Sequence, residues 1–225
     1  MSPDLVVVEG LRRTRSTLAS WHAARWRTLV PWFAGALAVA LLLLVAVTLV
    51  GHLVTPDTTV HRLFSASMGE VLLRNGLVLA LHAMACVAGF IAGSSLPLEA
   101  ERYGPRWRAV HDHAGRFAML FVTAATLFSL STQAWILGSI LSDMSWQLGL
   151  PVNELVLTVL PHALIELTAL FLPLAAWLIA SRRGEWDHLL AATIVTVTIA
   201  IPMLVLAAYI ETRFWPEIVA AAAGR

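Results

Sequence analysis

The polar residues best suited to chemistry in this chain lie inside apolar stretches. One set recurs at every fourth position and consists of Glu154, Thr158, His162 and Glu166. This spacing places its members along one side of a helix. Pro161 lies in the same turn and lacks a backbone donor, so we expect the helix to bend there. A histidine and a carboxylate one turn apart can bind a metal, line a polar cavity or hold neighbouring helices together.

A second apolar stretch carries a comparable stripe, made of Asn75, His82, Cys86, Gly89 and Gly93. Gly89 and Gly93 form a small-xxx-small pair, which predicts close packing against another helix. His82 and Cys86 are candidate metal ligands together with the histidine and glutamate of the first stripe, because the two i,i+4 pairs lie at equal depth.

The composition of the chain indicates which kind of element carries these stripes. Of 225 residues, 59% are hydrophobic and only 13% are charged, whereas soluble domains carry about 25% charged residues. Five apolar runs are long enough for a helix to cross ~30 Å of hydrocarbon. We therefore predict an all-α transmembrane bundle over 29–217, with an Arg-rich segment at 1–28 and a short tail at 218–225. The five predicted spans are 29–54, 71–97, 117–141, 154–180 and 189–215.

The distribution of arginine predicts the orientation, because cytoplasmic segments retain positive charge that translocation disfavours. Most of the 15 basic residues lie in the amino-terminal segment, between the second and third predicted spans, and between the fourth and fifth. We expect a multi-pass protein of the cell membrane, surrounded by lipid, with its amino terminus in the cytoplasm and its carboxyl terminus outside. The net charge of +1 argues against a nucleic-acid partner.

Counting ~1.5 Å per residue from each span boundary places the polar groups of four spans in the outer half of the membrane. An ionisable group there is costly, by at least ~2.5–3.5 kcal/mol for Asp, Lys or Arg at the centre of a span. The cluster admits three interpretations: a structural network, a polar cavity for binding or transport, and a metal or haem site. Its predicted members are Arg74, Asn75, His82, Gln133, Pro161, His162, Glu166 and Glu211.

Signatures of catalysis are missing from the sequence. Neither the zinc-protease pattern His-Glu-x-x-His nor the nucleophile pattern Gly-x-Ser-x-Gly occurs. The single cysteine excludes an internal disulfide and a cysteine-rich zinc site. We therefore expect neither an enzyme nor a bound cofactor.

Two motifs resemble the stage II sporulation protein M family. The segment PHALIEL at 161–167 is similar to the hallmark Pro-His-Gly-x-x-Glu-Leu of that family, with Ala163 in place of the usual glycine. The last span looks like the closing pattern of the family, with Pro202, AYIE at 208–211 and Pro216. The resemblance covers about 65–217.

The other points of comparison with this family lie in earlier spans. Asn75 stands where members often place asparagine at the start of a span. Gln133-Ala134 stands where Asn-Gly is common, which lengthens the amide side chain by one methylene.

The resemblance implies a helical membrane protein without known catalytic residues. The namesake helps the mother-cell membrane to engulf the forespore, together with membrane-anchored partners that degrade peptidoglycan, and relatives occur in organisms that do not sporulate. We expect a non-enzymatic component of a membrane or envelope complex, active in remodelling or scaffolding. Its expected partners are other membrane or envelope proteins or a second copy of the chain. The alternatives are a transporter or channel-like subunit with a polar cavity around His162 and Glu166, and a metal- or haem-binding membrane protein.

Overall fold

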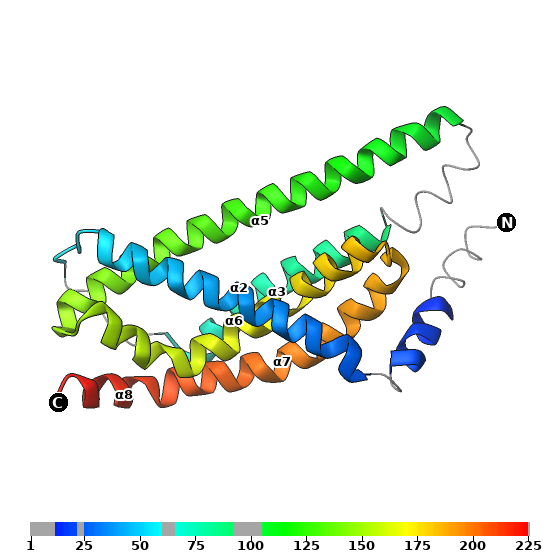
Figure 1. Cartoon of the computed structure of the whole chain (residues 1–225). Helices are drawn as coiled ribbons and strands as arrows, with labels where there is room; N and C mark the ends of the chain where they lie inside the picture. Colours follow the sequence, from blue (N-terminus) through cyan, green and yellow to red (C-terminus); the bar gives the residue numbers. More distant parts are fainter. Residues whose placement is uncertain (1–11, 22–24, 60–65, 92–104, 225) are drawn as a thin grey trace.

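Helices make up the regular structure of residues 12–21, 25–59, 66–91 and 105–224, the parts of the chain that the computed structural model describes (Figure 1). Five of these helices are long and apolar enough to cross a membrane, which confirms the predicted all-α, five-span architecture. Residues 12–21 are also helical. The other elements are α2 (Arg25–Leu53), α3 (Met68–Phe90), α5 (Pro105–Leu148), α6 (Val152–Arg183), the 3-10 turn η2 (Trp186–His188), α7 (Leu189–Arg213) and α8 (Trp215–Ala222).

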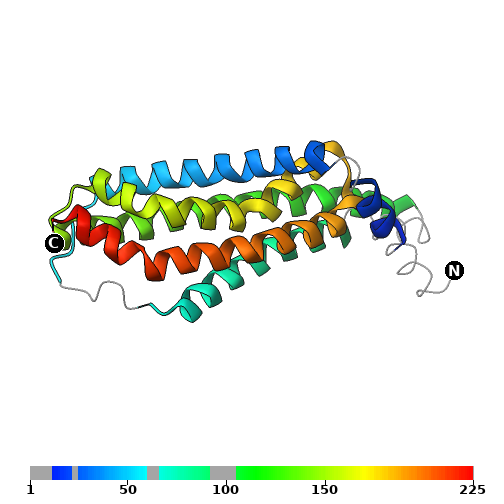
Figure 2. The same cartoon turned by 90° about the horizontal axis from the view of Figure 1, so that it is seen from below.

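The central element of the bundle is α6. The helices α2, α3 and α7 pack against it, while α5 packs chiefly on α2 (Figures 1 and 2). Every residue over 167–177 of α6 is buried, including the large side chains of Phe171 and Trp177. A helix that is buried on all sides has no face left for lipid. At this level, α6 therefore fills the middle of the protein.

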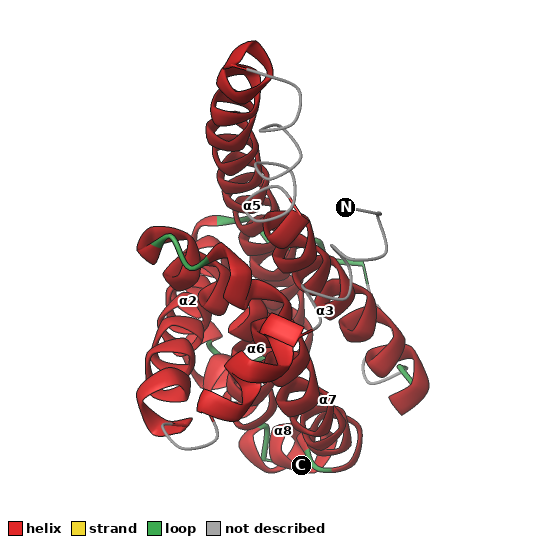
Figure 3. Ribbon diagram, turned by 90° about the vertical axis from the view of Figure 1, so that its right-hand side faces the viewer, coloured by secondary structure: helices red, strands yellow, loops and turns green. Residues whose placement is uncertain are grey.

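The long helix α5 differs most from the predicted spans. It begins at Pro105 and runs for 44 residues, roughly 66 Å at ~1.5 Å per residue, which is about twice the thickness of the hydrocarbon layer. Among its described residues, Thr123–Leu148 is the part that is long and apolar enough to cross a membrane. Figure 3 shows the first half of α5 leaving the bundle.

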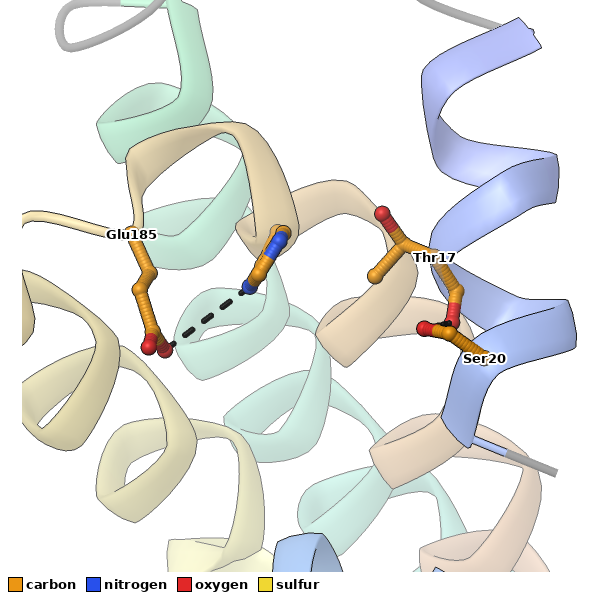
Figure 4. Close-up of polar contacts among 4 residues, drawn as sticks. Thr17, Ser20 and Glu185 are labelled. Carbon is orange, nitrogen blue, oxygen red and sulfur yellow. Dashed lines mark hydrogen bonds and ion pairs between the residues drawn. The ribbon is translucent and has the colours of Figure 1, made fainter. Parts of the chain in front are cut away.

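The helix over 12–21 packs against the end of the bundle where α6 turns into α7. Trp21 contacts the rings of Trp32 and His188 edge-on, with centroid distances of 5.2 and 5.7 Å. In Figure 4, Glu185 lies beside His188, with 3.7 Å between Oε2 and Nδ1. In the same view, the Ser20 hydroxyl donates to the Thr17 carbonyl at 2.7 Å. This helix and α8 lie at opposite ends of the bundle, as an odd number of crossings requires (Figure 1).

The closest approach between α2 and α5 occurs at Gly138. A Cβ atom there would lie 2.5 Å from the Val50 Cβ and 2.9 Å from the Val47 carbonyl oxygen. Ala134, one turn earlier, is also buried, so the two residues form a small-xxx-small pair facing α2. This pair was not predicted from the sequence, although it has the same spacing as Gly89 and Gly93.

A candidate polar site between α3, α6 and α7

Four members of the predicted cluster meet where α3, α6 and α7 adjoin. The Asn75 side chain of α3 lies within hydrogen-bonding reach of the Glu166 carboxylate of α6. The carboxylates of Glu166 and Glu211 interact across α6 and α7, and the Arg74 guanidinium of α3 attracts Glu211. We call these four residues, Arg74, Asn75, Glu166 and Glu211, the carboxylate site.

Local features of the helices position the α3 side of this site. Ser67 and Glu70 form a capping box: the Ser67 hydroxyl accepts from the Glu70 backbone N–H at 3.3 Å, and the Glu70 carboxylate accepts from the Ser67 N–H at 2.7 Å. This cap fixes where α3 begins, because it satisfies backbone donors that have no partner within the helix. Arg74 and Asn75 follow in the next turn and project towards α6 and α7.

The charges of the carboxylate site do not balance when both carboxyl groups are ionised. The Arg74 guanidinium supplies one positive charge against the two negative charges of Glu166 and Glu211. Like charges close together are unfavourable in surroundings of low dielectric constant. A proton or a cation would offset the extra negative charge. The Asn75 amide supplies a neutral hydrogen-bond donor to the Glu166 carboxylate.

His162 belongs to a different group of contacts, although it lies one turn before Glu166 on the same helix. Its ring centroid is 5.4 Å from that of Trp215, at the start of α8. The Trp215 indole N–H donates to the Thr158 hydroxyl at 3.1 Å, and that hydroxyl donates to the Leu155 carbonyl at 2.7 Å. His162 is buried, and its Nδ1 atom has no hydrogen-bond partner among the described residues. His162 therefore joins α6 to α8, while Glu166 faces α3 and α7.

Replacing His162 tests whether its role is packing. We expect His162→Phe to keep the midpoint of thermal unfolding within a few degrees, because it fills the same space and removes an unpaired polar atom that costs about 1–3 kcal/mol. His162→Ala leaves a cavity against Trp215 and should lower stability by about 2–4 kcal/mol. Unfolding of the purified protein in mild detergent measures both. A severe loss in His162→Phe would contradict the packing role.

His82 and Cys86 bind the backbone of α6. The His82 Nδ1–H donates to the Leu170 carbonyl at 2.8 Å, and the Cys86 thiol donates to the Pro173 carbonyl at 3.2 Å. Pro173 has no backbone N–H, so the Ala169 carbonyl lacks its usual partner within α6, and the two cross-helix bonds go to the nearby carbonyls of Leu170 and Pro173. Both side chains therefore fasten α3 to the central helix.

The four candidate metal ligands do not gather into one site. No three His, Cys, Asp or Glu residues within the described ranges are arranged to hold a metal ion. Equal depth does not bring such residues together, because depth says nothing about which side of a helix faces which neighbour. His82 and Cys86 face the backbone of α6, His162 faces Trp215, and Glu166 faces Asn75 and Glu211.

The His82 bond makes a specific prediction about stability. We expect His82→Leu to destabilise the bundle by about 1 kcal/mol, because a hydrogen bond between membrane helices contributes about that much. Met84→Leu is the matched control, since Met84 is 66% exposed on the same helix and should be neutral. Denaturation in mixed micelles compares the two variants. Equal stability would show that the Leu170 carbonyl does not depend on His82.

The remaining predicted residues have other surroundings. Gln133 lies on α5, where its Nε2 donates to the Ser129 hydroxyl of the same helix at 3.0 Å, so it does not join the carboxylate site. Pro161 is exposed on α6. Gly89 of α3 lies against Trp177 and Leu189: a Cβ atom there would come within 2.8 and 2.9 Å of their side chains. Gly93 lies outside the described residues.

A polar assembly at the end of α2 was also missed. The His52 Nε2 pairs with the Asn153 carboxamide oxygen at 2.7 Å. The Ser142 hydroxyl donates to the Val54 carbonyl at 2.9 Å. These bonds tie the end of α2 to the last part of α5 and to the first turn of α6.

Three residues that carry the family resemblance, Asn75, Glu166 and Glu211, come from three helices and meet in the carboxylate site. No protein-family model, curated protein or solved structure matches this chain.

Proposed function

We propose that this chain is a non-enzymatic scaffold of the cell membrane, related to stage II sporulation protein M, that works by assembling with other membrane or envelope proteins. The observation that carries the proposal is the filled centre of the bundle, where every residue of α6 over 167–177 is buried. Transporters and channels place a polar cavity or path near the middle of the membrane. A tightly packed apolar centre is typical of a rigid protein whose partners bind to its outer surface.

The carboxylate site supports the same proposal. Asn75, Glu166 and Glu211 interact across three helices, so the site specifies how α3, α6 and α7 pack. The same three residues carry the resemblance to the sporulation protein. A packing role at the motif positions requires no catalytic chemistry.

Co-purification tests the proposal. The full-length tagged chain is extracted from native membranes in mild detergent, and the proteins that accompany it are identified by mass spectrometry. We expect Glu166→Ala to lower both the thermal stability and the recovery of partners. Glu154→Ala is the matched control, because Glu154 is exposed in the first turn of the same helix and should leave both unchanged. The proposal would be contradicted if Glu166→Ala kept full stability and intact complexes but lost the transport of a solute.

The unequal charge of the carboxylate site favours a second candidate function, a transporter subunit that binds a proton or a cation between Glu166 and Glu211. Reconstituted vesicles with an internal pH-sensitive dye test it. This function requires proton or cation flux in the wild type that Glu166→Gln abolishes. Vesicles that are no leakier than protein-free ones would remove it.

A further inference from the structure

We infer that two copies of this chain associate through one side of α5, where Gln133 of each copy pairs with Gln133 of the other. The inference rests on the proposed assembly function and names one partner, a second copy. It starts from the half of α5 that departs from the bundle (Figures 1 and 3).

The first part of the α5 span has little contact with the rest of the protein. Among the side chains described on α5, the buried ones lie from Ala134 onward. Before that residue, Leu120, Phe121, Leu127 and Phe128 are all at least 60% exposed, and Phe128 reaches 74%. Most of them are apolar and suit lipid. The exception is a polar set within the membrane-crossing part, made of Thr126, Ser129 and Gln133.

Gln133 cannot complete its hydrogen bonds on its own helix. A carboxamide has two N–H donors and one carbonyl acceptor, and the bond to Ser129 uses a single N–H. Serine and threonine hydroxyls can donate to the carbonyl one turn back, as Thr132 does to Phe128 at 2.9 Å. The single hydroxyl of Ser129 cannot satisfy the two N–H donors and the carbonyl oxygen of the Gln133 amide together. In hydrocarbon, an unpaired polar group costs several kcal/mol, so the carbonyl oxygen of Gln133 requires a donor from outside α5.

A second copy supplies that donor at the right place. Two identical membrane proteins side by side share the same orientation, so a twofold axis along the membrane normal brings each residue to the depth of its counterpart. A carboxamide is both donor and acceptor, and two of them therefore pair reciprocally. Glutamine side chains bond across membrane helices in this way.

The spacing on α5 defines which side is the contact. Thr126, Ser129 and Gln133 are separated by three and four residues and lie on one side. Ala134 and Gly138 lie on the side that packs against α2. Phe128 is highly exposed, but it lies on another side of α5 and is not part of the contact.

Cysteine cross-linking in native membranes tests the geometry. The natural Cys86 is fully buried, so the wild-type chain should give no disulfide-linked dimer on oxidation with copper phenanthroline. We expect Thr126→Cys to give a dimer of the chain and Phe128→Cys to give none. Equal yields at the two positions would overturn the inference. A product between Thr126→Cys and a different protein would overturn the choice of a second copy.

A second measurement tests the role of the amide. Energy transfer between labelled chains in lipid vesicles should show that Gln133→Leu weakens self-association about 3- to 10-fold, which is the range expected for hydrogen bonds between membrane helices. Thr132→Val is the matched control and should have no effect, because this hydroxyl bonds within its own helix. Unchanged association in Gln133→Leu would overturn the inference. Co-purification of other envelope proteins would survive that result, so the two proposals fail separately.

Discussion

Gly138→Ala is expected to lower the free energy of unfolding by about 1–3 kcal/mol, the usual cost of forcing an extra methyl group into a packed interior. The new Cβ would lie 2.5 Å from the Val50 Cβ and 2.9 Å from the Val47 carbonyl oxygen. Neither atom is the end of a flexible side chain, so α2 and α5 must move apart. Gly138→Val should cost more still.

Gly76→Ala is the matched control for this prediction. Gly76 lies within α3, and a Cβ atom there would meet nothing within 4 Å. Replacing a helical glycine by alanine in open space favours the helix by about 0.5–1 kcal/mol, so the control should be neutral or slightly stabilising. Thermal unfolding of the three proteins in one detergent separates the two outcomes. Equal stability of Gly138→Ala and wild type would show that α2 and α5 are not closely packed at Gly138.

Arg74→Met is the second substitution from which we expect a large effect. It removes the cation of the carboxylate site and leaves Glu166 and Glu211 facing each other without compensation. We expect a loss of about 1–3 kcal/mol in detergent or lipid, less than the about 3–5 kcal/mol that breaking a fully buried pair costs, because Arg74 is exposed and its charge is screened. Arg213→Met is the control, since Arg213 is exposed at the end of α7.

A double variant gives this prediction its specificity. Glu211→Gln removes the negative charge that Arg74 balances, so Arg74→Met combined with Glu211→Gln should recover most of the stability lost in Arg74→Met. The coupling between the two changes is the measured quantity, and it should be clearly different from zero. Additive effects would indicate that Arg74 and Glu211 act independently.

Hydropathy alone predicted five crossings, because a helix needs a minimum apolar length to cross the bilayer. Counting residues also placed Asn75, Glu166 and Glu211 in one half of the membrane, and the structure brings these three together. Depth follows from the rise per residue of a helix, so this part of the site was accessible from the sequence.

Counting residues did not predict which neighbouring helix each side chain faces. Gln133 lies on α5, which packs chiefly on α2, while His82 and Cys86 donate to the Leu170 and Pro173 carbonyls of α6. Their partners are backbone atoms, which have no signature in a sequence. The pairing of Trp215 with Thr158 was missed for a related reason, since it depends on how α8 packs beside α6.

The central position of α6 has a consequence for biosynthesis. Spans enter the membrane in the order of translation, and individually stable helices then associate. The helix around which α2, α3 and α7 pack is the fourth to be made. When α2 and α3 have been inserted, the carbonyl groups to which His82 and Cys86 will donate have not yet left the ribosome. A chain truncated before α6 should therefore contain loosely associated helices, which are open to the quality-control proteases of the membrane. Packing of the bundle is completed only when the last two spans, α6 and α7, have been inserted.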